Sequence, residues 1–167
     1  DTITAASGTN TINAGDGDDT INLNDGTNSV LAGVGVDTIT VSSGTNTIDA
    51  GDGADSITLS GGANTLTAGS GNDTITASGG TNTIATDGGN NVVTLIDGHN
   101  SVTAGADNDT ITAAGGFNTI DAGAGDDKID LNNGTNSVVA GSGADTITAA
   151  GGTNTIHAGS DADTITL

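Results

Sequence analysis

The amino-acid sequence predicts an all-β fold, a parallel β-solenoid (β-roll) whose short strands stack coil upon coil into two facing parallel sheets. Two observations predict it. An 18-residue pattern repeats without insertion or deletion, and apolar and polar residues alternate within each repeat, as in strands. Nine repeats fill residues 1–162 and residues 163–167 begin another. We therefore expect one domain over residues 1–167, built from nine coils.

Each repeat divides into two nine-residue halves, and each half is expected to form a six-residue turn followed by a short strand. In residues 38–41, Ile39 and Val41 face the interior while Thr38 and Thr40 face outward. In the other half, Ala14 begins an inward row of alanines that is interrupted once, by Thr86. A helix is excluded by the frequent glycine and β-branched residues. Stacking at ~4.7–4.9 Å per coil predicts a rod roughly 40–45 Å long.

The composition excludes several classes of function. All 21 acidic residues are Asp, and with a single Lys and no Arg the net charge is −20. Such a chain cannot bind a nucleic-acid backbone through ion pairs, and no apolar run is long enough to insert into a membrane. High charge with one aromatic residue, Phe117, is also typical of disorder. Asp at fixed positions instead favours a hard cation with oxygen ligands.

One turn of each repeat reads Ala-Gly-x-Gly-x-Asp-x-Ile-x, as in residues 50–58. It resembles the Gly-Gly-x-Gly-x-Asp-x-U-x pattern of the RTX (repeat-in-toxin, haemolysin-type) calcium-binding β-roll, where U is a large aliphatic residue. The departure is Ala for the first Gly, and the resemblance covers the whole chain but only one half of each coil. It implies that calcium lies between successive turns on one edge, bound by Asp side chains and turn carbonyls. It also implies a protein that is exported unfolded and folds outside the cell in calcium.

The spacing of the Asp residues points to a divalent cation independently. One Asp per coil makes a column of carboxylates that would repel one another, and shared cations would remove that repulsion. Asn91 replaces the sixth Asp within a degenerate turn at residues 86–91. Seven adjacent Asp pairs remain, so we expect about seven calcium ions. The alternative is that each Asp only caps its turn.

Asp107 and Asp161 stand where other repeats have the second turn glycine. Either this position needs a positive φ, which Asp tolerates, or these carboxylates add ligands. The predicted metal ligands are Asp1, Gly15, Gly17, Asp19, Gly33, Gly35, Asp37, Gly51, Gly53, Asp55, Gly69, Gly71, Asp73, Gly105, Asp107, Asp109, Gly123, Gly125, Asp127, Gly141, Gly143, Asp145, Gly159, Asp161 and Asp163.

The opposite edge carries Asn at the corresponding position of every coil. Because an amide both donates and accepts hydrogen bonds, we expect a metal-free ladder of stacked Asn side chains there. Its members are Asn10, Asn28, Asn46, Asn64, Asn82, Asn100, Asn118, Asn136 and Asn154.

Nothing in the sequence predicts an enzyme. His99 is expected in a turn and His157 on a strand, both solvated and far apart, so no Ser-His-Asp arrangement is implied. The Gly15-Asp16-Gly17 type of turn has neither the following helix nor the Lys of a phosphate loop. The chain has no Glu to complete an EF-hand.

Paired Thr residues form outward ranks on the first sheet, ~6.6–7 Å apart across each strand. A flat double rank of Thr resembles the ice-binding face of insect antifreeze solenoids, whereas the simpler interpretation is that Thr is a soluble β-former. The possible ice-binding residues are Thr38, Thr40, Thr58, Thr74, Thr76, Thr110, Thr112, Thr146 and Thr148.

The two ends share the same repeat phase and carry no caps, which predicts either a slice of a longer protein or head-to-tail stacking of rods. The prediction for function is a calcium-binding structural rod of a secreted or cell-surface protein of adhesin, toxin or surface-layer type. Its expected partner is calcium, and its expected location is extracellular. The alternatives are an ice-binding module and a self-assembling filament subunit.

Overall fold

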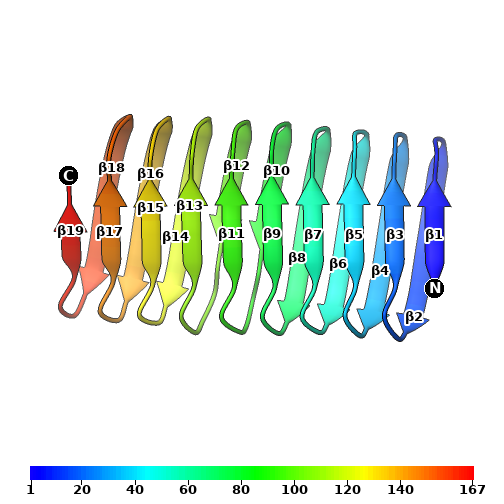
Figure 1. The fold of residues 1–167 in the computed structure, drawn as a ribbon, viewed down its shortest axis with the longest axis horizontal. Coiled ribbons are helices and arrows are strands. Elements are labelled where there is room, and N and C mark those ends of the chain that lie inside the picture. The colour runs from blue at the N-terminus through cyan, green and yellow to red at the C-terminus, as the bar shows by residue number, and fades with distance from the viewer.

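Nineteen strands and no helix make up the fold, which the computed structural model describes over residues 1–167. Ten strands form one sheet and nine form the other, and every neighbouring pair is parallel. Figure 1 shows the coils side by side in chain order, with the two termini at opposite ends of the row. The predicted parallel β-solenoid is confirmed. The structure therefore contains no helix that is long and apolar enough to cross a membrane.

The first sheet contains the odd-numbered strands. They are β1 (Thr2–Ala5), β3 (Thr20–Leu23), β5 (Thr38–Val41), β7 (Ser56–Leu59), β9 (Thr74–Ala77), β11 (Val92–Leu95), β13 (Thr110–Ala113), β15 (Lys128–Leu131), β17 (Thr146–Ala149) and β19 (Thr164–Thr166). The second sheet contains β2 (Thr9–Asp16), β4 (Thr27–Val34), β6 (Thr45–Asp52), β8 (Ala63–Ser70), β10 (Thr81–Ala85), β12 (His99–Thr103), β14 (Phe117–Ala124), β16 (Thr135–Ser142) and β18 (Thr153–Ser160).

The pairing register equals the repeat length. Ile39 pairs with Ile57, and Ile57 with Ile75, so each residue stacks on the one 18 positions later. A side-chain type that recurs once per repeat therefore becomes a continuous column along the rod. This is why single residue types, rather than local motifs, build the edges described below.

The second-sheet strands are longer than expected. Most have eight residues instead of a short strand, because pairing continues through the first turn glycine, as between Gly15 and Gly33. A side chain cannot replace glycine in such stacked turns: a Cβ on Gly33 would lie 1.9 Å from the carbonyl oxygen of Gly15. The strands β10 and β12 end after five residues, directly before the turns that depart from the repeat.

The core is a narrow double layer of the predicted aliphatic rows. From the second coil onward the rows of Ile, Val, Leu and Ala are buried, and Thr86 is fully buried at its interruption of the alanine row. The end coils differ from the expectation. Ile165 is 45% exposed, and Ile12 and Ile156 are only partly buried, because a terminal coil has a neighbour on one side only. Burial along this rod thus depends on stacking.

Candidate metal centre

The Asp column lies inside the turn edge. Each Asp directly precedes a first-sheet strand, as Asp19 precedes β3 and Asp37 precedes β5. The seven inner members are at most 2% exposed, whereas Asp1 is exposed at the end of the column. The inner members are Asp19, Asp37, Asp55, Asp73, Asp109, Asp127 and Asp145. Ionisable side chains are rarely this buried unless a partner compensates them.

One oxygen of each column carboxylate except that of Asp1 has a partner within the protein. The backbone N–H of Asp19 donates to Oδ1 of Asp37 at 2.8 Å, and that of Asp37 donates to Oδ1 of Asp55 at 2.8 Å. The same bond recurs along the column, with distances up to 3.0 Å at Asp163. Oδ1 therefore links each coil to the one before it, which is a bond between coils and not the cap of its own turn raised above as the alternative role.

The other oxygen of each carboxylate has no partner. Oδ2 is buried without a hydrogen bond in all seven inner members of the column. A buried carboxylate oxygen without a donor costs several kcal/mol on the order-of-magnitude scale for such groups. Seven such atoms in one column are compatible with a stable fold only if cations or protons reach them. These atoms are what a calcium ion would need from this chain.

Backbone carbonyls of the same turns are also free. No hydrogen bond outside the strand ladders ends on the carbonyl oxygen of the second turn glycine, for example Gly35 or Gly53. The carbonyl oxygen of the first turn position, in contrast, accepts a hydrogen bond beside the turns that depart from the repeat. The carbonyl of Gly69 accepts from the backbone N–H of Gly88, and that of Gly105 accepts from the backbone N–H of Ala124. The second glycine therefore offers the freer oxygen for a metal shell.

The degenerate turn at residues 86–91 shows which groups lie near the position that Oδ2 has in the other coils. Oδ1 of Asn91 accepts from the backbone N–H of Asp73 at 2.9 Å, as an Asp would, so its Nδ2 takes the place of Oδ2. Nδ2 donates to the carbonyl of Gly89 at 2.9 Å and to Oγ1 of Thr86 at 3.1 Å. Here an amide N–H group satisfies the carbonyl that the other coils leave free. The Thr86–Asn91 pair thus satisfies this coil's polar atoms within the protein, a contact that sequence reasoning missed although it marked both positions as exceptions.

Burial raises the pKa of the column carboxyls. The pKa of Asp55, Asp109 and Asp127 rises to about 6 in each case, mainly through desolvation, and backbone hydrogen bonds oppose part of the rise. Neighbouring column carboxylates add repulsion that raises the pKa further, as Asp73 and Asp37 do for Asp55. The pKa of Asp37, Asp73 and Asp145 is raised for the same leading reason. The metal-free column thus resists full ionisation.

No group of three or more His, Cys, Asp or Glu side chains is close enough to hold a metal by itself. The space between two adjacent coils is bordered by two column carboxylates, one from each coil. A calcium shell here would therefore need backbone carbonyls in addition to carboxylates, which is the mixed oxygen set that calcium accepts.

The two Asp residues at glycine positions have the backbone conformation of glycine. Asp107 has φ 74° and Asp161 φ 83°, so both adopt the positive φ that was one of the two options for this position. Oδ2 of Asp107 accepts from the backbone N–H of Gly89 at 3.0 Å on the exposed side of the turn, away from the buried column. Asp87 also has a positive φ of 63° at the first turn position, and the repeat alignment alone could have identified it.

The opposite edge is the predicted Asn ladder. Nδ2 of each Asn donates to Oδ1 of the next at 2.7–2.8 Å, as from Asn46 to Asn64 and from Asn64 to Asn82. The same Nδ2 also donates to a turn carbonyl three residues earlier, for example from Asn64 to Gly61 at 3.0 Å. The inner amides are at most 4% exposed and bonded at both ends, so this edge has no free oxygen comparable to the Asp Oδ2 atoms.

One of the two histidines lies in a different element from the one expected. His99 is not in a turn but begins β12, and its ring stacks on Phe117. His157 lies on β18 and is exposed, as predicted. Both histidines are on the outer face of the second sheet and take no part in the metal centre.

Fold and edge together define a β-solenoid with a column of unpaired buried carboxylate oxygens. The family model of the RTX calcium-binding nonapeptide repeat (4 copies) matches residues 1–30, 31–66, 58–93, 103–138 and 130–165. The chain therefore belongs to the RTX calcium-binding repeat family and is a calcium-binding repeat domain, a structural fold rather than a catalytic one. No curated protein and no solved structure matches it.

Proposed function

We propose that the chain is a structural rod whose fold is completed by a column of calcium ions along the Asp edge. The observation that carries the proposal is the set of seven buried Oδ2 atoms without partners. Each ion would lie between adjacent coils and take Oδ2 atoms of the column together with carbonyls of the second turn glycines. Where Asn91 replaces Asp, its amide would stand in for the ion and divide the column into two parts.

The number of ions follows from the intact pairs of the column. Five Asp residues from Asp1 to Asp73 and four from Asp109 to Asp163 make seven adjacent pairs. Seven divalent ions would bring the net charge from −20 to about −6. The same step would remove the repulsion between buried carboxylates, which is the electrostatic obstacle to a compact state in this chain.

Calcium binding of this kind couples to folding. The column exists only when coils stack, so ions bind the folded chain and stabilise it by mass action. RTX repeat proteins are typically secreted, and extracellular calcium would favour the folded rod. We therefore propose that the rod belongs to a secreted or cell-surface protein, of adhesin, toxin or surface-layer type, and acts as a spacer that stiffens on export.

Far-UV circular dichroism tests this function directly. The protein should give a β spectrum in millimolar calcium, lose it in excess EDTA and regain it when calcium is restored. Magnesium at the same concentration serves as the control, because it demands a tighter octahedral shell than stacked turns provide. A β spectrum that persists unchanged in EDTA at neutral pH would overturn the proposal.

Ice binding is a second candidate because one outward rank of the first sheet is regular over several coils. Thr40, Thr58, Thr76, Thr94 and Thr112 stack in register on successive strands without interruption. The exposed ion pair of Lys128 and Asp130 ends the regular part of the face. Thermal hysteresis in calcium, abolished by Thr74→Tyr or Thr112→Tyr, would establish this function, and absence of hysteresis at high protein concentration would exclude it.

A further inference from the structure

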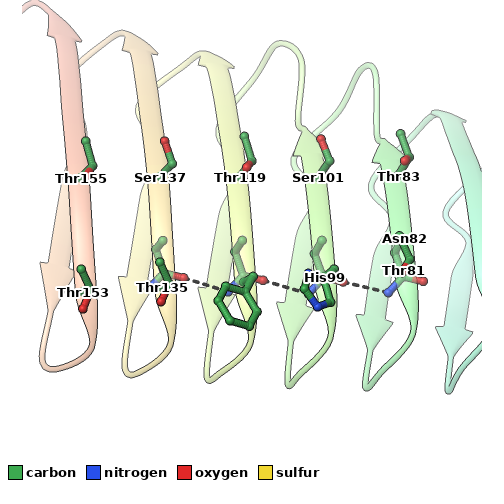
Figure 2. Close-up of a pocket in the computed structure, with 14 residues that line it drawn as sticks. Thr81, Asn82, Thr83, His99, Ser101, Thr119, Thr135, Ser137, Thr153 and Thr155 are labelled. Carbon is green, nitrogen blue, oxygen red and sulfur yellow. Dashed lines mark hydrogen bonds between the residues drawn. The ribbon is translucent and has the colours of Figure 1, made fainter.

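A groove of about 430 Å³ crosses the outer face of the second sheet at strands β10 to β18. Two ranks of outward side chains border it, and Figure 2 shows them on successive strands. One rank consists only of hydroxyl side chains, namely Thr83, Ser101, Thr119, Ser137 and Thr155. We name this feature the aromatic groove because its other rank includes the rings of His99 and Phe117.

The aromatic pair departs from the repeat in a way that core packing does not require. Most coils have Thr at this position, and Phe117 is the only Phe, Tyr or Trp in the chain. Its side chain is 58% exposed. The ring stacks on His99 with centroids 4.8 Å apart and planes 11° apart. An ordered aromatic surface in contact with water adds nothing to the core and remains available for stacking with a ligand.

The surroundings of Phe117 leave room for a ligand. His99 covers one face of the ring, whereas the next residue in the register on the other side is the much shorter Thr135. The groove continues past Thr135 to Thr153 and Thr155. A flat ligand of about the size of one ring can therefore stack beside Phe117 while hydroxyl groups flank it on both sides.

The chemistry of the lining restricts the ligand class. The groove contains one hydrophobic residue and no Asp, Lys or Arg, although the chain carries 21 Asp. Backbone groups on this face are used in the parallel ladders, and the Asn amides of the floor are used in the ladder drawn as dashed lines in Figure 2. An added peptide strand thus finds no backbone partners, an apolar ligand finds too little apolar surface, and the net charge of −20 repels polyanions.

A neutral saccharide fits what remains. Pyranose rings have apolar C–H faces that pack on aromatic rings and hydroxyls that both donate and accept, as the Thr and Ser side chains do. We propose that the aromatic groove binds a neutral oligosaccharide, with one sugar ring stacked on the free face of Phe117 and the neighbouring sugars hydrogen-bonded to the two ranks. The fully bonded Asn floor would hold the ranks in place before binding, which lowers the ordering cost.

The test is titration calorimetry in millimolar calcium with cellohexaose, chitohexaose and maltohexaose as separate probes. The double variant His99→Thr/Phe117→Thr returns both positions to the residue of the other repeats, so it should fold normally. Val92→Thr is the matched control, because it makes the same kind of replacement at an exposed apolar residue of the first sheet. We expect at least one probe to bind, with at least about tenfold weaker binding to the double variant and unchanged binding to the control.

Three results would overturn the proposal: no binding of any probe to the wild-type protein, equal binding to the double variant, or tighter binding of an anionic alginate hexamer. Circular dichroism of each protein with calcium and with EDTA is recorded on the same samples. It reports the proposed calcium dependence separately, so a failure of sugar binding and a failure of calcium-driven folding are distinguishable.

Discussion

The two edges of the rod place a short polar side chain at equivalent points of every coil, yet they leave different atoms unsatisfied. On the Asn edge each amide donates to the next and also to a nearby carbonyl, so the column is closed within the protein. On the Asp edge Oδ1 accepts a backbone hydrogen bond but Oδ2 has no donor. The difference is one NH₂ group for one oxygen atom. Because of this difference, the amides of the Asn ladder satisfy one another, whereas seven buried oxygens of the Asp column have no partner within the protein.

Asn91 shows the same contrast within the Asp edge itself. Its Nδ2 donates to the carbonyl of Gly89 and to Thr86, and its coil has no unpaired buried oxygen. The unpaired buried oxygen is therefore present where the column residue is an acid and absent where it is an amide. The predictions below exchange the two chemistries, or neutralise one of them, from the largest expected effect to the smallest.

Asn64→Asp should break the ladder. Asn64 donates to Oδ1 of Asn82 and to the carbonyl of Gly61, and a carboxylate would turn both contacts into repulsion inside a buried edge. We expect a loss of roughly 3–5 kcal/mol in the free energy of unfolding, measured by urea denaturation in saturating calcium. Thr65→Asp adds the same charge on the exposed side of the same strand and should change stability by less than about 1 kcal/mol. Similar losses in the two variants would refute a special role for the ladder.

Asn91→Asp should join the two parts of the Asp column. It would create carboxylate pairs with Asp73 and Asp109, so we expect about two more bound calcium ions by titration calorimetry. Asn90→Asp, one residue away on the exposed side of the turn, is the control and should leave the number of ions unchanged. If Asn91→Asp binds no additional calcium, the proposed ligand set is wrong.

The stability of the calcium-free rod should fall as the pH rises, whereas carboxylates whose pKa is lowered by folding make a protein more stable as the pH rises. Burial raises the pKa of Asp55, Asp109 and Asp127 from 3.8 to about 6, so the fold favours their protonated forms. This contribution is fully present below about pH 3.8 and is lost as the pH rises through about 6. In EDTA we expect β circular dichroism at pH 4 that disappears by pH 7, whereas calcium should preserve it at pH 7. A calcium-free sample that gains β structure with rising pH would contradict the assignment.

Asp107→Gly should have the smallest effect and separates a turn role from a ligand role. Asp107 has φ 74°, a conformation that glycine adopts without strain, and its Oδ2 bond to Gly89 is exposed. We expect less than about 1 kcal/mol of change in stability and no change in calcium stoichiometry. Asp109→Asn, in the buried column two residues on, should lower the stoichiometry. Loss of an ion from the Asp107 variant would instead make Asp107 a ligand.

Much of this architecture could be predicted because the period is constant. A residue that recurs every 18 positions must stack on its own kind, so the aliphatic rows, the Asp column and the Asn ladder all follow from the repeat alone. The same reasoning predicted a positive φ at Asp107 as one of two options, and Asp107 has a φ of 74°.

What the repeat could not determine is the direction in which each atom points. The sequence places one Asp per coil, but only the turn's backbone path aims an N–H of one coil at Oδ1 of the next and leaves Oδ2 buried without a donor. The Thr86–Asn91 pair and the stacked rings of His99 and Phe117 depend in the same way on side chains from different positions meeting in space. Sequence alone determined the columns, because periodic stacking depends only on chain position. Tertiary structure decided their hydrogen bonds, because these depend on angles and distances that repeat length does not contain.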